Sequence, residues 1–320
     1  MIDQQQLQDT VNDYINALPY PARPRNLYEP IRYTLESGGK RLRPTLLLSV
    51  VQALGGDTAK ALRQAAGIEM FHNFTLLHDD VMDNADVRRG RPTVHVRYGQ
   101  DSAILSGDAM LTMATQMMAD CDISLMPRVL GLFNRTAMEI YQGQQYDMDF
   151  EDRDDVTVDE YIEMIRLKTS VLLGCACMTG AILAGADDDT CRAFYSYGEQ
   201  LGLAFQLQDD CLDTYGDPLV FGKQIGGDIL NDKKTWLRIT ACREDRSGVM
   251  ERVRQEHLTG QDKIDAIRAL YDSLDLENRI AALVSDYADR AVHALDNVQL
   301  SHGSRQFFSQ LAQKLNTRVN

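Results

Sequence analysis

The stretch Phe74-Thr75-Leu76-Leu77-His78-Asp79-Asp80-Val81-Met82-Asp83 leads an apolar run directly into a group of three aspartates. The stretch Leu203-Ala204-Phe205-Gln206-Leu207-Gln208-Asp209-Asp210-Cys211-Leu212-Asp213 repeats this arrangement. Because residues four apart share one face of a helix, the first and last aspartates of each group point the same way. Such carboxylates repel one another unless a positive charge lies between them. Mg²⁺ suits this role, since it takes oxygen ligands and completes its shell with substrate phosphates.

Apolar residues recur at helical spacing through much of the chain. Ile68, Phe71, Phe74 and Leu77 precede the first aspartate group at helical intervals, and the alternating pattern of strands is hard to find. Four of the eight prolines lie between residues 19 and 30, and no low-complexity linker interrupts the rest. We therefore expect one all-α domain over residues 1–320, a bundle of roughly a dozen helices.

The composition is that of a globular protein with an excess of acid. The 320 residues are 44% hydrophobic and 25% charged, with a net charge of −14, which argues against a binder of nucleic-acid backbones. The first residues lack the basic region and apolar core of a secretory signal, and no stretch reaches the roughly 18 to 20 apolar residues of a membrane span. The six cysteines show no CxxC or disulfide-scaffold spacing. We expect free thiols and a cytoplasmic location.

Four basic groups accompany the two acidic ones. Three lie in glycine-rich turns or beside helix starts, where backbone N–H groups also attract anions, and the fourth interrupts an apolar helix. They are Gly38-Gly39-Lys40-Arg41-Leu42-Arg43, Arg88-Arg89-Gly90-Arg91, Phe221-Gly222-Lys223 with the later Lys233, and Lys168-Thr169. A single basic group is usually a solvated face. The conjunction with both acidic groups predicts a pocket for two polyanions and several metal ions.

Taken in order, these motifs resemble those of the trans-isoprenyl diphosphate synthase family, the polyprenyl synthetases. The matching segments are 39–44, 76–83, 88–90, 168–169, 202–213, 222–223 and 226–229. The resemblance implies the isoprenoid synthase fold, with helices around a central cavity, and a homodimer. It also implies a reaction in which an allylic diphosphate (dimethylallyl, geranyl or farnesyl) is coupled head-to-tail to isopentenyl diphosphate, with release of pyrophosphate.

The resemblance further implies a role for each motif, centred on neutralising the charge of the leaving group. Three Mg²⁺ ions clamp the allylic diphosphate, and their ligands here are Asp79, Asp83 and Asp209. The other aspartates, Asp80, Asp210 and Asp213, act through water or hold the ligands. The direct cationic contacts are Arg88, Lys168, Lys223 and Lys233, and the neutral dipoles near the developing carbocation are Thr169 and Gln206. Isopentenyl diphosphate binds without metal, at Lys40, Arg43, His72 and Arg89.

In this family, the residues just before the first aspartate set the product length. They correspond to Phe74 and Thr75 here, with Phe71 one turn deeper. Each added unit of five carbons gains about 4 kcal/mol from burial, at about 0.8 kcal/mol per CH₂, so elongation ends where a side chain blocks the way. One bulky residue beside a small one resembles enzymes that make geranylgeranyl diphosphate, with twenty carbons. Farnesyl diphosphate, with fifteen, and a longer chain are the alternatives.

Other interpretations depend on particular residues. A terpene cyclase has no use for a second diphosphate pocket, and a catalytically silent partner subunit characteristically loses the acidic motifs that this chain keeps. Glu69-x-x-His72 matches half of a di-iron bundle site but has no second copy. The acidic run 147–152 lacks the glycine and glutamate of a calcium-binding loop, and we expect a solvated helix end there.

Overall fold

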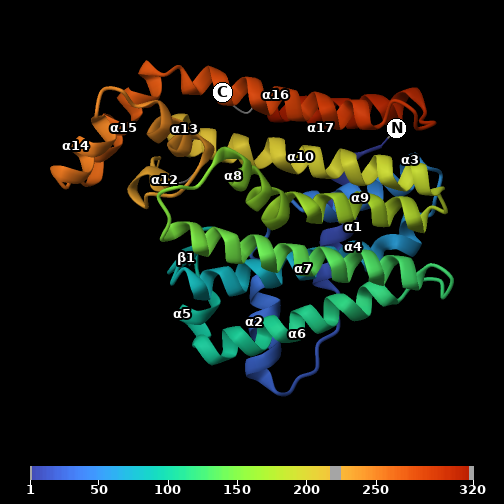
Figure 1. The fold of residues 1–320 in the computed structure, drawn as a ribbon. Helices are drawn as coiled ribbons and strands as arrows, with labels where there is room; N and C mark the ends of the chain where they lie inside the picture. The colour runs from blue at the N-terminus through green and yellow to red at the C-terminus, as the bar shows by residue number, and fades with distance from the viewer. Residues whose placement is uncertain (1, 217–224, 317–320) are drawn as a thin grey trace. The chain divides into compact units, whose positions relative to one another are not determined.

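Helices form most of the chain in the computed structural model, which describes residues 2–216 and 225–316 (Figure 1). A short hairpin, β1 (Val87–Arg88) with β2 (Arg91–Pro92), pairs antiparallel around the turn at Arg89-Gly90. The expected all-α class is confirmed. Lys223, which the sequence predicts as a site residue, lies outside the described residues, as do Phe221 and Gly222.

The chain divides into two compact units, of which the first comprises Met1–Arg135 with Cys175–Tyr195 and the second Thr136–Gly174 with Ser196–Asn320. The first unit holds α1 (Gln4–Asn16), α2 (Arg25–Glu36), α3 (Leu42–Ala53), α4 (Thr58–Met82), α5 (Val94–Tyr98) and α6 (Gln100–Ala119). Residues of both units belong to α7 (Met126–Glu151), α9 (Val171–Leu183) and α10 (Asp188–Tyr215). The second unit holds α8 (Val158–Ile165), the π-helical turn η1 (Arg166–Ser170), α12 (Gly227–Leu230), α13 (Trp236–Glu244), α14 (Val249–Gln255), α15 (Gly260–Ser273), α16 (Leu276–Ala294) and α17 (His302–Asn316). A single domain over residues 1–320 stays a prediction.

Helix α4 forms the core of the first unit. Its buried residues are not confined to one face, and a helix of this kind must be surrounded by protein. Both α3 and α6 pack against it, and Gly67 permits a close approach, because a Cβ there would lie 3.0 Å from Met117 Cβ. Asp57 caps the start of the helix by accepting from the Ala59 N–H at 3.0 Å. The first aspartate group therefore stands at the end of a buried helix.

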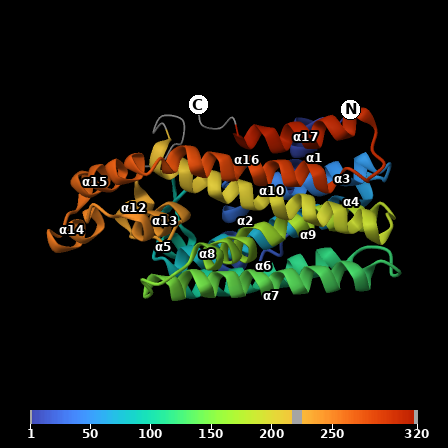
Figure 2. The ribbon, with the colours of Figure 1, turned by 45° about the horizontal axis from the view of Figure 1, so that its top comes forward.

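In the second unit, α16 and α17 run side by side in both ribbon views (Figures 1 and 2). Tyr197 of α10 packs against α17: its hydroxyl donates to the Phe308 carbonyl at 2.9 Å, and the two rings meet edge to face with centroids 5.2 Å apart. Both aromatic side chains are fully buried. This packing anchors the helix that carries the second aspartate group.

The continuous helical run Val158–Leu183 corrects the expectation that no stretch is apolar enough to span a membrane. By length and composition alone, this run could cross one. However, 78% of its most apolar window is buried inside the protein. Burial in the core accounts for its hydropathy, as it does for the core helices of many soluble proteins.

Candidate active site

The first acidic group lies at the C-terminal end of α4, where the helix dipole disfavours carboxylates unless cations approach them. Asp80 is only 4% exposed, and its Oδ1 accepts from Arg88 Nε at 2.7 Å. Burial raises the pKa of Asp80, and the Arg88 guanidinium opposes this rise. Asp79 and Asp83 are more accessible. The protein thus holds the middle aspartate and leaves the outer two closer to solvent.

The β1–β2 hairpin carries Arg88 to this aspartate. The connection is fixed by the Ala85 N–H, which donates to the Asp80 carbonyl at 3.0 Å, and by Thr93 Oγ1, which donates to the Ala85 carbonyl at 2.7 Å. Arg89 takes a φ of 51°, a conformation that is costly for a residue with a Cβ and persists where its surroundings enforce it. As a result Arg88 binds the acidic group, whereas Arg89 turns to another partner.

Arg89 and Arg43 form a positively charged cluster beside His72. Arg89 Nη1 donates to the Gly38 carbonyl. Its guanidinium lies so close to Gly39, which has a φ of 134°, that a Cβ there would be only 3.0 Å away. Arg43 Nη1 donates to His72 Nε2 at 3.2 Å. The sequence motif needs its second glycine because a residue with a Cβ rarely adopts a φ of 134°.

Three properties of this cluster suit it to an anion. Burial lowers the pKa of His72 well below its usual value, and the neighbouring arginines, Arg43 first, lower it further, so the ring is neutral and accepts from Arg43. Among the described residues, neither Arg43 nor Arg89 has a carboxylate within ion-pair distance. The buried Nε of Arg43 also has no hydrogen-bond partner there. Since buried donors are rarely left unpaired, a phosphate oxygen is the natural acceptor.

A buried ion pair supports the loop that carries Lys40. Arg41 Nη1 donates to Glu69 Oε1 at 2.8 Å, and the two side chains are only 2% and 3% exposed. Arg41 Nε and Nη2 donate to Asn12 Oδ1 at 3.0 Å and to the Leu35 carbonyl at 2.6 Å. These bonds stabilise a left-handed residue, with a φ of 47°, at the start of α3. The bond from Arg41 Nη1 also engages Glu69, the glutamate that a di-iron site would use as a metal ligand.

The second acidic group lies near the C-terminal end of α10 and follows the same plan. Asp210 is 3% exposed; Tyr161 Oη donates to its Oδ2, and Gln206 Nε2 donates to its Oδ1 at 3.1 Å. Burial raises the pKa of Asp210 to about 7, while the charge of Lys233 opposes the rise. Asp209 and Asp213 are more accessible. Here too the middle aspartate is bound inside the protein.

Asp213 shapes the segment from Gly226 to Lys233. Its Oδ2 accepts from the Asp228 N–H at 2.9 Å, and its carbonyl accepts from the Gly226 N–H at 2.6 Å. Gly226 takes a φ of 83° at the start of α12, which glycine adopts without strain. Lys233 Nζ lies 3.7 Å from Asp228 Oδ1. One aspartate of the second group therefore organises the backbone that presents a predicted cationic residue.

Lys168 and Thr169 lie in η1, and π-helical turns often mark functional sites. The backbone of this turn packs closely against two glycines. A Cβ at Gly143 of α7 would lie 2.4 Å from Lys168 N, and a Cβ at Gly202 of α10 would lie 2.5 Å from the η1 backbone. Thr169 Oγ1 donates to Gln206 Oε1 at 3.1 Å. The two neutral dipoles predicted from the sequence are thus in direct contact.

The expectation of a solvated helix end at residues 147–152 is wrong at Asp147. Helix α7 continues to Glu151, and the half-buried Asp147 accepts through Oδ2 from Lys168 Nζ at 2.6 Å. Asp147 follows Gly143 by one turn on the same face of α7. The glycine admits the backbone of Lys168, and the aspartate pairs with its ammonium group.

The predicted chain-length residues lie along α4, just before the first acidic group. Phe71 and Phe74 are buried, and their ring centroids are 5.5 Å apart. Phe74 also packs against His78 at 4.8 Å, and Phe71 against Phe133 at 5.1 Å. Thr75 is half-buried. Which of these residues meets a growing product stays a prediction.

The carboxylate oxygens of the two acidic groups are suitable ligands for Mg²⁺. In the described residues, no cluster of three or more His, Cys, Asp or Glu side chains has the arrangement of a metal site. Mg²⁺ does not require one, because it commonly takes one or two carboxylates together with water and phosphate oxygens. Asp79 on α4, Asp83 directly after it and Asp209 on α10 are carboxylates near negative helix ends whose neighbouring acid is already bound. They could hold the ions that the sequence predicts.

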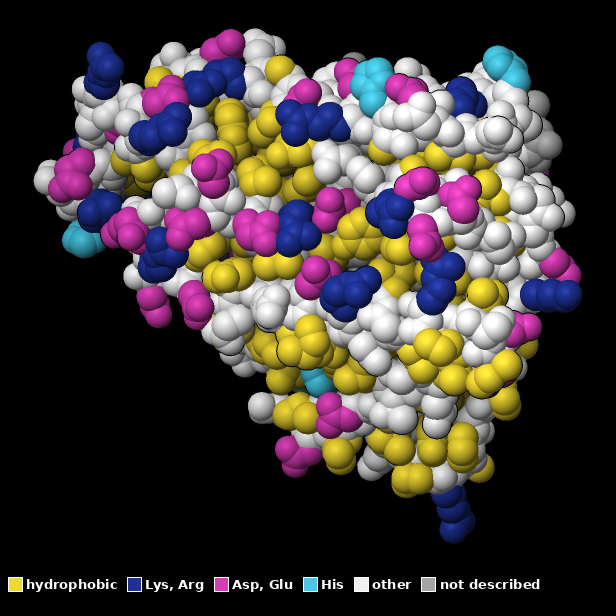
Figure 3. Space-filling model, turned by 45° about the vertical axis from the view of Figure 1, so that its right-hand side comes forward, with side chains coloured by type: hydrophobic (Ala, Val, Ile, Leu, Met, Phe, Trp, Pro, Cys, Tyr) yellow, Lys and Arg dark blue, Asp and Glu magenta, His cyan; other side chains and the backbone are white. Residues whose placement is uncertain are grey.

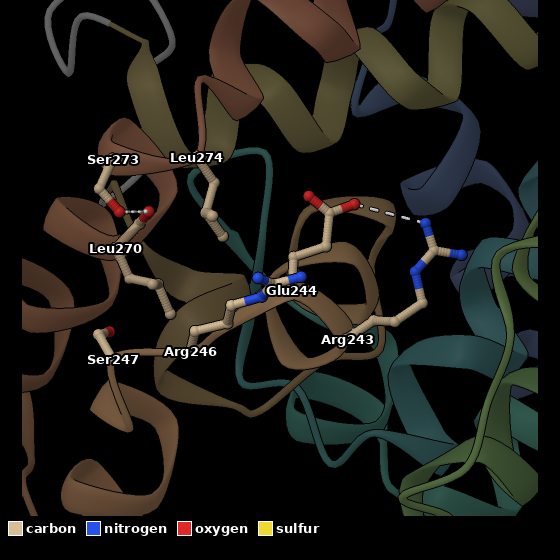
Figure 4. Close-up of a pocket in the computed structure, with 7 residues that line it drawn as sticks. All are labelled: Arg243, Glu244, Arg246, Ser247, Leu270, Ser273 and Leu274. Carbon is tan, nitrogen blue, oxygen red and sulfur yellow. Dashed lines mark hydrogen bonds and ion pairs between the residues drawn. The ribbon is translucent and has the colours of Figure 1, made fainter.

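A surface pocket of the second unit contains none of the predicted site residues (Figure 4). It lies between Arg243 and Glu244 of α13 and Leu270 and Leu274 at the end of α15. Glu244 Oε1 lies 3.4 Å from Arg243 Nη2, and its carboxylate also accepts from Arg279 at 2.9 and 3.0 Å. The one carboxylate among the residues that line this pocket is therefore already paired with arginines.

Three residues that support the site could not be identified from sequence patterns: Arg41, Asp147 and Tyr161. Arg41 stands among other basic residues, and nothing in its spacing marks it as the buried one. Nothing in the spacing of Tyr161 identifies the aspartate that it contacts, because this contact joins separate helices.

Comparisons with known proteins identify the family of the chain. The sequence model of the polyprenyl synthetase family matches residues 24–274. The geranylgeranyl diphosphate synthase of Methanosarcina mazei is 41% identical over 233 residues, which cover 72% of either chain. The geranylfarnesyl diphosphate synthase of Natronomonas pharaonis is 40% identical over 251 residues, or 73% of this chain and 74% of the relative.

The fold also matches that of solved enzymes of this family. A crystal structure of geranylgeranyl pyrophosphate synthase matches with a TM-score of 0.93 and 39% identity, and the match covers 100% of both chains. This likeness confirms the expected isoprenoid synthase fold. With its ordered motifs, its fold and its relatives in agreement, the chain belongs to the polyprenyl synthetase family and is a short-chain trans-prenyltransferase.

Proposed function

We propose that this enzyme condenses isopentenyl diphosphate with an allylic diphosphate and releases mainly geranylgeranyl diphosphate. One observation carries the proposal. On α4, Asp79 follows His72 by about two turns, so the acidic group and the cluster of Arg43, His72 and Arg89 share a face, about 10 Å apart along the axis. A site for cations beside a site for a bare anion suits two diphosphates, one bound through metal and one without it.

The reaction depends on neutralising charge. The allylic C–O bond breaks, the double bond of isopentenyl diphosphate attacks the allylic cation to form a C–C bond, and the departing pyrophosphate takes the released proton. Bound Mg²⁺ would stabilise the negative charge on that leaving group. Lys168, held by Asp147, would present its ammonium group to the same oxygens. Thr169 and Gln206 are neutral and bonded to each other, so they would offer the cation dipoles and no carboxylate to trap it.

The individual roles follow from the chemistry of each group. Enzymes of this family generally depend on Mg²⁺, and we assign three ions per active site to Asp79, Asp83 and Asp209. The direct contacts to the allylic diphosphate are Arg88, Lys168, Lys223 and Lys233; those to isopentenyl diphosphate are Lys40, Arg43, His72 and Arg89. Asp80, Asp210 and Asp213 hold these groups in place, which their bonds to Arg88, Tyr161 and the Asp228 N–H support.

The product length rests on Phe74. Its ring is packed against Phe71 and His78 close to the first acidic group, where a bulky side chain can limit the space for a growing apolar chain. Two relatives carry the names geranylgeranyl and geranylfarnesyl diphosphate synthase, so products of twenty and twenty-five carbons occur among similar sequences. With an aromatic ring at this position, we propose that elongation ends at twenty.

We also propose that the enzyme is a cytoplasmic homodimer of single-domain subunits. All six cysteines are free thiols, as is usual in a reducing compartment. Leu105 of α6 is 61% exposed, and Figure 3 shows hydrophobic side chains at the surface in the lower part of the view, at the height of α6 in Figure 1. Exposed apolar patches commonly mark protein contacts. Light scattering should therefore give about twice the subunit mass of 36.0 kDa, and Leu105→Lys should lower it.

A product-length assay tests the main proposal. Purified enzyme receives Mg²⁺, labelled isopentenyl diphosphate and one primer at a time, and the dephosphorylated products are separated by chromatography. We expect one main product of twenty carbons. A product of fifteen or twenty-five carbons would correct the length and keep the reaction class. No incorporation with any primer would favour the silent-subunit alternative, and a cyclised hydrocarbon formed from the primer alone would favour a cyclase.

Two variants separate the two diphosphate sites. Arg43→Gln should raise KM for isopentenyl diphosphate and leave KM for the primer nearly unchanged, because Arg43 belongs to the metal-free pocket. Asp79→Ala should abolish turnover without unfolding the protein, because it removes a metal ligand. Equal effects of Arg43→Gln on both KM values, or near-normal activity of Asp79→Ala, would contradict these assignments.

A further inference from the structure

A buried tyrosine contacts the second acidic group. Tyr161 of α8 is 1% exposed, and its hydroxyl donates to Asp210 Oδ2. Asp210 is itself buried, and a carboxylate removed from water must be compensated by hydrogen-bond donors. The reaction proposed above assigns Tyr161 no role, although it is one of the largest fully buried side chains of the protein.

The contact is one link in a chain of hydrogen bonds across three helical elements. Thr169 Oγ1 of η1 donates to Gln206 Oε1, and Gln206 Nε2 donates to Asp210 Oδ1, each at 3.1 Å. With Tyr161 on Oδ2, both carboxylate oxygens of Asp210 accept bonds from the protein. Asp210 therefore links α8 and, through Gln206, η1 to α10. The orientation of its carboxylate is fixed by Tyr161 on one oxygen and by Gln206 on the other.

Fixing Asp210 also fixes its neighbours on α10. Side chains on one helical turn rotate together, because the backbone hydrogen bonds make the turn rigid. Asp209 precedes Asp210 directly, and Asp213 follows within the same turn. A small rotation of α10 at Asp210 would therefore redirect both outer carboxylates, and small errors of position at a catalytic site lower rates strongly.

We propose that Tyr161 is a positioning residue for the second acidic group: by holding Asp210, it sets the directions in which Asp209 and Asp213 present their carboxylates to a metal-bound diphosphate. This inference rests on the proposed function, because it takes these aspartates as part of the metal site. The first acidic group has an equivalent, since Arg88 holds Asp80 at 2.7 Å. The second group uses a neutral, fully buried donor for the same purpose.

Tyr161→Phe tests this role, because it removes one oxygen and one hydrogen bond and keeps the ring. Tyr197→Phe is a matched control, since Tyr197 is equally buried, lies in the same unit, and donates to the Phe308 carbonyl at 2.9 Å. Either change should destabilise the metal-free protein by a similar amount, which urea unfolding measures. Calorimetric titration with Mg²⁺ and inorganic pyrophosphate then reports on the metal site without turnover.

For Tyr161→Phe, we expect binding of Mg²⁺ and pyrophosphate to weaken by about tenfold or more, the usual effect of losing a residue that orients metal ligands. Tyr197→Phe should stay within about twofold of the unchanged enzyme, and neither variant should change KM for isopentenyl diphosphate. Equal binding by the two variants would overturn the inference. An unchanged enzyme that neither binds pyrophosphate with Mg²⁺ nor turns over would instead overturn the proposed function.

A second variant guards against misfolding of Tyr161→Phe. Gln206→Met removes the other donor to Asp210 and keeps a side chain of similar length. If the network positions Asp210, Gln206→Met should also weaken binding of Mg²⁺ and pyrophosphate, and the double variant should lose less than the product of the two single effects. Independent, multiplicative losses would show that the two donors do not act through Asp210 together.

Discussion

Breaking the buried pair of Arg41 and Glu69 should strongly destabilise the first unit, and Glu69→Gln tests this. At 2.8 Å and an effective dielectric constant of about 20, the attraction amounts to about 6 kcal/mol, most of which is offset by desolvation of the two charges. Removing one partner of a buried pair nevertheless costs about 3–5 kcal/mol, because the other charge stays buried without compensation.

The contacts that Arg41 keeps place the expected cost of Glu69→Gln near the lower end of the range of about 3–5 kcal/mol. Arg41 keeps its bonds to Asn12 Oδ1 and the Leu35 carbonyl, and the new amide can still accept one hydrogen bond. We therefore expect Glu69→Gln to lower the free energy of unfolding by about 3 kcal/mol. Urea unfolding at pH 7, followed by circular dichroism, measures this change.

Glu29→Gln provides the control, because the pair of Glu29 with Arg25 is at least as short, at 2.6 Å, but the side chains of Arg25 and Glu29 are 76% and 39% exposed. Exposed pairs contribute about 0–1 kcal/mol. If Glu69→Gln and Glu29→Gln destabilise the protein equally, burial does not govern the strength of these pairs, and the reasoning fails. A loss confined to Glu69→Gln, with a higher KM for isopentenyl diphosphate, would also connect the pair to the loop that carries Lys40.

Three further outcomes follow from contacts in the site. Gly143→Ala should lower turnover and stability, because its Cβ would lie 2.4 Å from Lys168 N; activity and thermal unfolding should change together. Phe74→Ala should lengthen the product and cost about 3–5 kcal/mol of stability, as for other buried aromatics, which chromatography and urea unfolding measure. His72 should make the protein less stable as pH falls: its pKa is depressed in the folded state by burial and by Arg43, so the unfolded chain takes up a proton below about pH 6.5 that the folded protein does not. That loss is at most about 1.4 kcal/mol per pH unit, and His72→Gln should remove it from unfolding curves measured between pH 5 and 7.

Each of these has an outcome that would contradict it. Normal turnover in Gly143→Ala would mean that η1 can shift without consequence for Lys168. An unchanged product from a folded Phe74→Ala would mean that another residue ends elongation. If unfolding curves of His72→Gln keep the full pH dependence, another group titrates in that range.

The sequence was sufficient to predict the fold class and the positions of both acidic groups, because helical periodicity and spacing are local properties. It was not sufficient to predict the partners of buried charges. Arg41 and Arg43 are both arginines beside a glycine-rich turn, yet one is paired with Glu69 and the other has a buried Nε without a partner among the described residues. That difference depends on the packing of α1, α2 and α4 around Arg41, and no spacing within the motif encodes it.

The paired aspartates show where local reasoning reaches its limit. Successive residues on a helix point about 100° apart, so Asp79 and Asp80 point in different directions, and so do Asp209 and Asp210. In this structure Asp80 and Asp210 are the buried members of the two pairs, and a buried carboxylate requires hydrogen-bond donors. The donor differs between the two groups: Arg88 comes from a hairpin 8 residues later, and Tyr161 from a helix 49 residues earlier. The need for a donor follows from burial, whereas the residue that supplies it depends on the tertiary structure, and only the structure could identify Tyr161.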